Sequence, residues 1–373
     1  MVIATSDSTN TLVSLDNAIK RVSSLEGLQI NNKSQSVAFR ETSIYLPEDG
    51  FCLENDEVPI YLPQDGARVG ADECLGCLPQ VMDARDELLA KKPVHFTRAS
   101  PERILYVGQG EVAHAVAQQC DVIVSDRATT CHILAFRSTS DVADPLSSLT
   151  HIDAASYGVC VRQMVEQHRI HHGTHQVELS VHILGGYQDS QSASRKISNW
   201  LIHLLADIAE EEQNWMRMTL RDCAITSLND SGFSSPLGRG LALDLRTGDA
   251  FLASCNANVM GPRQTLRSAR LWSQSTTPQL SLIHDQQSST LSITPFEYSP
   301  FEGLDRLLSF SDDVLLQYTS TSPECEEEGF CHSVRSTLTL VRDVPAHVAF
   351  AGGRPLAYQR IGTTNTWKVV RSF

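Results

Sequence analysis

The segment that decides the expected fold reads Val122-Ile123-Val124-Ser125-Asp126-Arg127-Ala128-Thr129-Thr130-Cys131-His132-Ile133-Leu134-Ala135-Phe136. Residues 122–124 form a run of branched apolar side chains that is typical of a buried strand, and residues 132–136 are largely apolar and compatible with a second strand. Ser125 and Asp126 stand between the runs, where short polar side chains favour a turn. The pattern therefore predicts strand, turn and strand, with Cys131 at the start of the second strand.

Two histidines after Cys131 are candidate bases for its thiol. Side chains alternate along a strand, so we expect Cys131 and His132 to point to opposite faces, which argues against His132 as the base. The second histidine, His151, follows a polar, proline-containing link at residues 138–148. We expect this link to let the chain return beside the first strand and to bring His151 close to Cys131.

A cysteine and a histidine at neighbouring strand ends can form a thiol–imidazole pair for nucleophilic catalysis. The thiolate is the attacking species, and an imidazole that titrates near neutral pH can take the thiol proton and later protonate a leaving group. Asp153 lies two positions beyond His151, on the same strand face, where it could orient the ring. The residues alone leave an alternative open, in which Cys131 is a buried apolar thiol and His151 a hydrogen-bonded turn residue.

A series of short motifs accompanies this segment. Ser-Asp-Arg-Ala-Thr-Thr-Cys-His at residues 125–132 resembles the signature of the protein N-terminal asparagine amidohydrolase family, although Arg127 stands where the family usually carries an acidic residue. The other segments that resemble the family, in its order, are residues 103–107 (RILYV), 150–153 (THID), 181–187 (VHILGGY), 228–230 (LND), 320–323 (STSP) and 335–338 (RSTL). Together the resemblance covers roughly residues 95–370.

The resemblance implies an enzyme that converts the N-terminal asparagine of a protein or peptide to aspartate and releases ammonia, in the Arg/N-degron pathway of protein degradation. It implies Cys131 as the nucleophile and His151 as the acid and base. Ser125 and Thr130 are candidates for lining the pocket or the oxyanion site, where backbone N–H groups at the turn before Cys131 would serve as donors.

A substrate with a free N-terminus carries a positive amine, which calls for a carboxylate. Asp126 and Asp153 are the candidates for holding that amine or for orienting the catalytic ring. Two rival functions remain open. One is another Cys-His acyl-transfer enzyme that acts on internal residues, and the other is a non-catalytic module that binds N-termini.

The composition limits the classes of function. A net charge of −14 and a pI near 5.3 disfavour nucleic acid and anionic membranes as partners. The sequence shows no signal peptide and no apolar run of membrane-spanning length, so we expect the ten cysteines to be reduced thiols of a cytoplasmic or nuclear protein. It also shows no glycine-rich phosphate loop and no His-Glu-x-x-His motif, so we expect no cofactor and no metal.

Two clusters invite a metal-binding interpretation. Cys74 and Cys77 form a Cys-x-x-Cys pair, but no second ligand pair stands at a familiar spacing. Residues 168–175 contain four histidines at the end of a predicted helix, where the helix dipole favours histidine. We interpret the first cluster as incidental thiols and the second as structural histidines.

The predicted domain organisation has two parts. Residues 1–95 are expected to be an N-terminal extension that is partly disordered, and residues 96–373 to be the amidohydrolase catalytic domain. The extension contains a short duplication, because Ile-Tyr-Leu-Pro-x-Asp-Gly occurs at residues 44–50 and again at residues 60–66.

The apolar patterns predict an α+β fold, with mixed or antiparallel sheets and covering helices. Its clearest helix has an apolar stripe formed by Ile197, Trp200, Leu201, Leu204, Leu205 and Ile208. Near the C-terminus, residues 334–341 and 348–350 are predicted to be strands because β-branched and aromatic residues are frequent in them.

Overall fold

The computed structural model describes residues 70–233, 235–273 and 279–370. This part of the chain falls into two compact units. The larger unit contains residues 70–262, 279–292 and 357–370, and the smaller unit contains residues 263–273 and 293–356. The two Ile-Tyr-Leu-Pro-x-Asp-Gly segments lie outside the described residues. None of the described helices is both long and apolar enough to cross a membrane.

A six-stranded sheet forms the centre of the larger unit. Its strands are, in order, β11 (Ser281–Leu282), β3 (Glu111–Ala115), β6 (Leu146–Ile152), β5 (His132–Thr139), β7 (Val177–Gly185) and β8 (Met216–Ile225). The four central strands are antiparallel, whereas the edge strands β11 and β8 pair in parallel with β3 and β7.

A five-stranded sheet packs against it. Its strands are, in order, β1 (Val94–Phe96), β10 (Ala250–Cys255), β9 (Leu241–Asp244), β4 (Val122–Ser125) and β2 (Ile104–Tyr106). A third sheet contains β12 (His284–Asp285), β13 (Thr290–Ile293), β14 (Leu356–Arg360) and β15 (Trp367–Val369). Mixed and antiparallel sheets with helices confirm the predicted α+β class.

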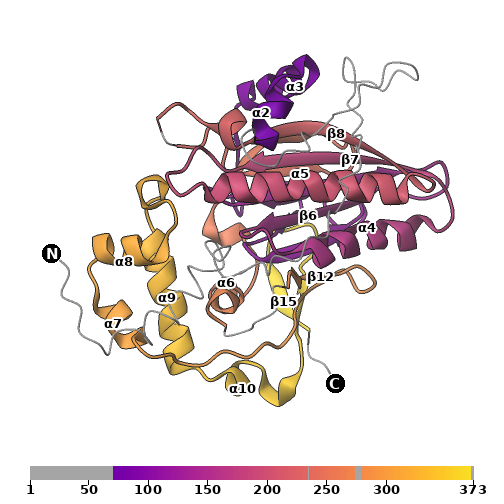
Figure 1. Ribbon diagram of the computed structural model, residues 1–373. Helices are drawn as coiled ribbons and strands as arrows, with labels where there is room; N and C mark the ends of the chain where they lie inside the picture. Colours follow the sequence, from indigo (N-terminus) through magenta and orange to yellow (C-terminus); the bar gives the residue numbers. More distant parts are fainter. Residues whose placement is uncertain (1–69, 234, 274–278, 371–373) are drawn as a thin grey trace, which may run out of the picture. The chain divides into compact units, whose positions relative to one another are not determined.

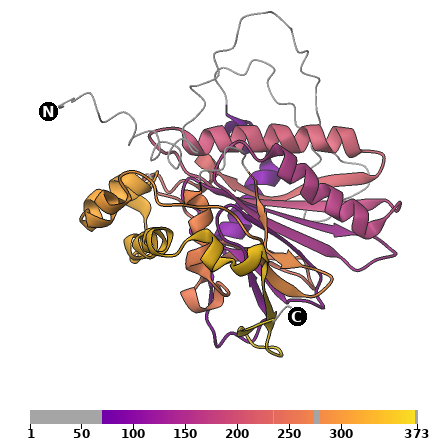
Figure 2. The same cartoon turned by 90° about the horizontal axis from the view of Figure 1, so that it is seen from below.

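Alternating side chains along the strands create separate apolar layers. Ile133 of β5 and Ile123 of β4 belong to the cluster between the two large sheets. The next residue of β5, Leu134, belongs to a cluster on the opposite face of the six-stranded sheet. Two helices cover that face, α4 (Gly158–His172) and α5 (Ala193–Glu212), and they lie beside each other in both views of the ribbon (Figures 1 and 2).

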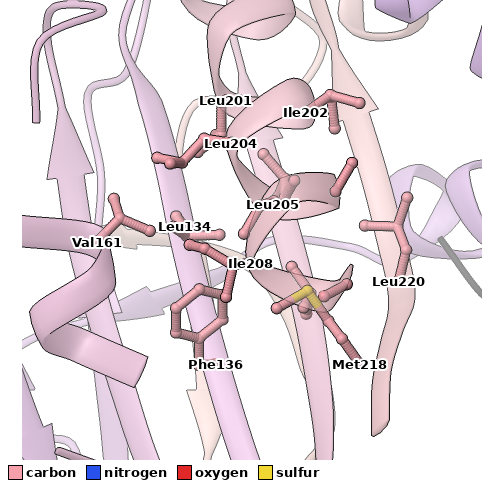
Figure 3. Packing of buried hydrophobic residues seen from close by; sticks show 14 of the residues in the cluster. Leu134, Phe136, Val161, Leu201, Ile202, Leu204, Leu205, Ile208, Met218 and Leu220 are labelled. Carbon is pink, nitrogen blue, oxygen red and sulfur yellow. The ribbon is translucent and has the colours of Figure 1, made fainter. Parts of the chain in front are cut away.

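The apolar stripe predicted on residues 197–208 faces the sheet, which confirms the expectation for this helix. Figure 3 shows how α5 packs against β5 and β8 through Leu201, Leu204, Leu205, Ile208, Leu134, Phe136, Met218 and Leu220. Full burial of a leucine side chain stabilises a fold by about 1.5–3 kcal/mol. This stripe therefore fixes α5 on the sheet, and the residues before and after α5 are positioned with it.

The central segment folds as strand, turn and strand, with β4 and β5 joined by the 126–131 loop. The two strands do not pair with each other, because β4 belongs to the five-stranded sheet and β5 to the six-stranded sheet. The loop thus crosses from one sheet to the other, a separation of about 10 Å between packed sheets. The chain does return close to β4, since Ser125 of β4 contacts His151 of β6, but β6 lies in the other sheet and pairs there with β5 and β3.

Residues 70–95 fold within the larger unit. They form α2 (Ala71–Gly76), α3 (Pro79–Ala90) and the beginning of β1, which pairs with β10. Leu88 of α3 is fully buried in the cluster between the sheets. Most of the predicted extension lies outside the described residues, and the division at residue 95 stays a prediction.

The smaller unit contains helices, and here two predicted strands were wrong. Its helices are α6 (Gln264–Ser268), α7 (Leu304–Ser309), α8 (Asp312–Thr319), α9 (Phe330–Asp343) and α10 (Ala346–Ala349). Residues 334–341 lie in α9. Val348 and Ala349 are the last two residues of α10, and Phe350 follows the helix. Thr337, Leu338 and Val341 are the buried residues of α9, a helical spacing that overrides the β-propensity of the segment.

Candidate active site

The 126–131 loop ends at Cys131, directly before β5 begins at His132. Cys131 carries a reduced thiol with intermediate exposure, and it packs against the apolar cluster between the two sheets. His132 points to the other face of the six-stranded sheet, where its Nε2 lies 2.7 Å from the Oγ of Ser198 in α5. This confirms that Cys131 and His132 face opposite ways. Full burial lowers the pKa of His132 to about 3.

His151 lies on the same face of the sheet as Cys131, near the end of β6. The ladder pairs His151 with Ile133, and Cys131 precedes Ile133 by two residues, directly before β5. Burial leaves His151 3% exposed and lowers its pKa to about 4, whereas the charges of Asp153 and Glu111 act to raise it. The ring is therefore neutral at neutral pH and can accept a proton.

Ser125 orients the ring of His151. Its Oγ lies 2.8 Å from Nδ1 of His151, and the contact joins the last residue of β4 to β6 across the space between the sheets. The other ring nitrogen, Nε2, is buried and has no hydrogen-bond partner within the described part of the chain. When Nδ1–H donates to Ser125, Nε2 keeps the lone pair that a base requires.

Paired glycines at the end of β7 hold the backbone of Cys131. The N–H of Gly186 donates to the carbonyl oxygen of Cys131 at 2.9 Å. A Cβ on Gly185 would lie 2.2 Å from the same oxygen, and both glycines have positive φ, +142° and +70°. A side chain at residue 185 would therefore displace the backbone at Cys131.

The carboxylate of Asp153 has partners other than the His151 ring. Its Oδ2 accepts from Gln109 Nε2 at 2.9 Å, and its Oδ1 accepts from the Tyr157 hydroxyl at 2.7 Å. Because β6 ends at Ile152, Asp153 begins the following loop. The group is buried, and its charge partly opposes the effect of burial, which lowers the pKa of the His151 ring.

Asp126, the second acidic candidate, is anchored to the five-stranded sheet. Its Oδ1 accepts from the Tyr106 hydroxyl at 2.9 Å, and its Oδ2 accepts from the backbone N–H of Cys255 at 2.6 Å. Burial, together with the charge of Asp126, raises the pKa of Tyr106, so the hydroxyl remains a donor. The Nε of Arg127 lies 4.0 Å from Oδ1.

The remaining residues of the loop make a tight turn. Arg127 adopts φ +61°, which is uncommon for a residue other than glycine. Ala128 donates its N–H to the carbonyl oxygen of Arg239 at 2.8 Å. Thr130, a candidate for the oxyanion site, is almost fully buried directly before Cys131.

Four residues near the site were not identified from the sequence: Gln109, Glu111, Tyr106 and Tyr157. The backbone around Gln109 runs beside β6, because Gly110 donates its N–H to the His151 carbonyl oxygen at 2.9 Å. The flanking glycines at residues 108 and 110 are a signal that could have indicated a turn at Gln109, and Tyr106 lies in one of the family-like segments. Glu111 and Tyr157 carried no comparable signal.

The histidines of α4 form a hydrogen-bonded network with serines beneath the helix. His168 contacts Ser138 Oγ through Nδ1 at 2.6 Å and Ser148 Oγ through Nε2 at 2.8 Å. His172 Nε2 shares the Ser138 hydroxyl at 2.7 Å, and His114 of β3 shares Ser148 at 2.6 Å. Over the described residues, no group of three or more His, Cys, Asp or Glu side chains is arranged to hold a metal.

The site as a whole combines three chemical capacities. The reduced thiol of Cys131 can act as a nucleophile, and the neutral ring of His151 can accept and return a proton at Nε2. The buried carboxylates of Asp153 and Glu111 lie near enough to the ring for their charges to act on its pKa. A thiol and a neutral imidazole are the groups that acyl transfer through a cysteine nucleophile requires.

Comparisons with known proteins agree with this chemistry. Residues 94–369 match the family model described as protein N-terminal asparagine amidohydrolase. Relatives with that same name in Sus scrofa and Homo sapiens are each 29% identical over 298 residues, which cover 78% of this chain and 91% of the relative. One from Arabidopsis thaliana is 25% identical over 274 residues, 66% of this chain and 77% of the relative. The chain therefore belongs to the protein N-terminal asparagine amidohydrolase family.

Proposed function

We propose that the protein hydrolyses the side-chain amide of an N-terminal asparagine, with Cys131 as the nucleophile and His151 as the acid and base. The observation that carries this proposal is the environment of the buried His151 ring. Ser125 contacts its Nδ1, and its Nε2 has no hydrogen-bond partner among the described residues. The ring lies on the same face of the six-stranded sheet as Cys131. The products are an N-terminal aspartate and ammonia.

The reaction proceeds through two acyl transfers. Nε2 of His151 takes the proton of the Cys131 thiol, and Sγ attacks the side-chain amide carbon of the substrate. The tetrahedral intermediate collapses when the same proton passes to the nitrogen, so the C–N bond breaks and ammonia leaves a thioester. Nε2 then takes a proton from water, and hydroxide adds to the thioester carbon. The C–S bond breaks to give the aspartate carboxyl group, and the proton passes from Nε2 to the departing Sγ, which restores the thiol and the neutral ring.

The negative oxygen of each tetrahedral intermediate needs hydrogen-bond donors. Backbone N–H groups at the turn around Thr130 and Cys131 are our candidates, with Ser125 and Thr130 close to the same position in the chain. One such preorganised donor is typically worth about 3 kcal/mol in the transition state.

The substrate's α-ammonium group distinguishes an N-terminal asparagine from an internal one. We assign its binding to Asp153, because the charge of this buried carboxylate reaches His151 and each of its oxygens can accept a further hydrogen bond beyond those from Gln109 and Tyr157. Asp126 is the second candidate. Asparagine and glutamine differ by one methylene, which pocket fit alone discriminates by about 1–3 kcal/mol. Binding of the amine at a fixed point therefore also determines where the side-chain amide lies relative to Cys131.

The substrates we propose are proteins and peptides with a free N-terminal asparagine in the cytoplasm or nucleus. Their deamidation would supply N-terminal aspartate for the Arg/N-degron pathway of protein degradation.

Mass spectrometry of an asparagine-initiated peptide tests the proposal. We expect a mass gain of about one dalton with the wild type and none with Cys131→Ala, since hydrolysis replaces NH₂ by OH. Matched peptides carry an N-terminal glutamine, an acetylated asparagine or an internal asparagine. Conversion of the acetylated or internal peptide would indicate a general Cys-His deamidase, and binding without turnover would indicate an N-terminus-binding module.

A further inference from the structure

The 126–131 loop is held at both of its ends by two glycine-containing segments. At its C-terminal end, the N–H of Gly186 donates to the carbonyl oxygen of Cys131 at 2.9 Å. Near its N-terminal end, Ala128 donates to the carbonyl oxygen of Arg239 at 2.8 Å, and a Cβ on Gly240 would lie 2.9 Å from the Cβ of Asp126. The position of the thiol thus depends on two segments that are far apart in sequence.

One side chain, Asn229, connects these two segments. Its Nδ2 donates to the carbonyl oxygen of Gly186 at 2.8 Å and to that of Gly238 at 2.9 Å. Its Oδ1 accepts the N–H of Gly238 at 2.8 Å. Asn229 is fully buried, so the three hydrogen bonds form without competition from solvent.

The short helix that presents Asn229 is itself held in an unfavourable conformation. This 3₁₀ helix, Thr226–Asn229, begins at Thr226 with φ +44°, which is rare for a β-branched residue. Thr226 Oγ1 lies 2.5 Å from Ser198 Oγ, and the Ser198 hydroxyl also contacts His132. Strain of this kind persists where the surrounding structure enforces it and is concentrated at functional sites.

We infer that Asn229 is a positioning residue for the nucleophile, acting through Gly186 on Cys131 and through the 238–240 segment on the start of the loop. The inference deepens the proposed function, since it assigns a residue to the same site. An amide is suited to the task because it supplies two donors and an acceptor in one plane. Loss of the amide would free both segments, and a nucleophile misplaced by 1 Å can lose about 10²-fold in rate.

Asn365 provides a matched control within the same unit. It is also buried, its Oδ1 accepts from the Ile104 N–H at 2.9 Å and from Arg360 at 2.8 Å, and its Nδ2 donates to the Glu102 carbonyl oxygen at 2.9 Å. Asn365→Ala therefore removes a comparable set of hydrogen bonds without touching the segments around the 126–131 loop.

The experiment compares Asn229→Ala and Asn365→Ala in the full chain, below the melting temperature of both variants. One readout is the alkylation rate of Cys131 by iodoacetamide, resolved by peptide mass spectrometry. The other is kcat and KM on the asparagine-initiated peptide. For Asn229→Ala we expect kcat to fall about 10²-fold with KM changed by less than about threefold, and the pH profile of Cys131 alkylation to shift. For Asn365→Ala we expect a similar loss of melting temperature with kcat and the alkylation profile retained.

Equal behaviour of the two variants, in kcat and in alkylation, would overturn the inference and leave Asn229 as an ordinary buried amide. If Asn229→Ala does not fold, Asn229→Asp replaces it. That variant keeps the shape and the acceptor, and a protonated carboxyl restores one donor. Its kcat relative to the wild type should therefore rise as the pH is lowered, and a flat ratio would count against the role.

The alkylation arm uses no substrate, so it separates the two hypotheses. A wild type that fails to convert the peptide would contradict the proposed function. The dependence of Cys131 reactivity on Asn229 would still be decided by the alkylation rates.

Discussion

At the scale of single residues, the hydroxyl of Ser125 holds Nδ1 of His151, and Nε2 has no hydrogen-bond partner among the described residues. Asp153 was the expected orienting group, but its oxygens accept from Gln109 and Tyr157, and Ser125 makes the contact to Nδ1. A neutral hydroxyl holds the ring without adding charge. The ring thus keeps a pKa of about 4, set chiefly by its burial.

Replacement of this hydroxyl should lower the rate of the chemical step. For Ser125→Ala we expect kcat to fall roughly 10–100-fold with little change in KM, because the ring loses its fixed tautomer and orientation. Steady-state kinetics on the asparagine-initiated peptide measure both constants. Ser147→Ala is the control, since this buried β6 hydroxyl has no hydrogen-bond partner within the described residues. Equal kcat values for the two variants would contradict an orienting role for Ser125.

At the scale of elements, the end of β7 determines where β5 can begin. Gly185 pairs with His132 across the ladder, and its Cα hydrogen faces the Cys131 carbonyl oxygen. Paired glycines permit close backbone approach and positive φ, and residues 185 and 186 show both. The partner in the close approach of Gly185 is Cys131, the residue proposed as the nucleophile.

A side chain at this point should therefore damage stability and activity together. In Gly185→Ala the new Cβ would meet the Cys131 carbonyl oxygen at 2.2 Å, a backbone contact that cannot yield easily. We expect a loss of about 4 kcal/mol or more in the free energy of unfolding, the range of severe steric change. Gly362→Ala is the control, because it also has positive φ, +56°, but nothing lies within 4 Å of its Cβ. Gly362→Ala should lower the free energy of unfolding by only about 1–2 kcal/mol, measured by urea denaturation. Equal losses in the two variants would show that the positive φ, and not the contact with Cys131, accounts for the effect at Gly185.

At the scale of the whole molecule, buried histidines make the stability of the fold depend on pH. Burial lowers the pKa of His114 and of His151 from 6.5 to about 4, and it also lowers that of His168. These rings are neutral in the folded chain and take up protons more readily when the chain unfolds. Their contribution to stability is therefore complete above pH 6.5 and is lost as the pH falls toward 4.

Urea denaturation between pH 7.5 and pH 4.5 should reveal this dependence. A shift from 6.5 to about 4 corresponds to roughly 3 kcal/mol for one fully buried ring, so we expect the wild type to lose several kcal/mol over this range. His114→Asn should be less stable at pH 7.5 but lose less on acidification. A free energy of unfolding that stays constant between pH 7.5 and 5 would contradict the buried, neutral state of the network.

The helical unit shows where sequence patterns misled. Residues 334–341 carry Val334, Thr337, Thr339 and Val341, whose side chains favour strands when taken one at a time. The segment is helical because Thr337, Leu338 and Val341 are buried on one side of α9 at helical spacing. Which side of a short segment is buried depends on its packing neighbours, and those are not local in sequence.

The sequence by itself determined the features that repeat along the chain. The period of two in residues 132–136 placed Cys131 and His132 on opposite faces, and the period near 3.6 in residues 197–208 defined the covering face of α5. The motif series indicated the family. These inferences succeeded because a strand or a helix imposes its own period on the residues within it.

Only the tertiary structure decided which distant residues meet at the site. It placed β4 and β5 in different sheets, and this brings Ser125 to Nδ1 of His151 across the space between them. It also gave Asp153 its partners Gln109 and Tyr157, and it placed Asn229 between Gly186 and Gly238. Such contacts depend on how two sheets stack and cross, and the stacking arises from the summed burial of many side chains rather than from any local pattern.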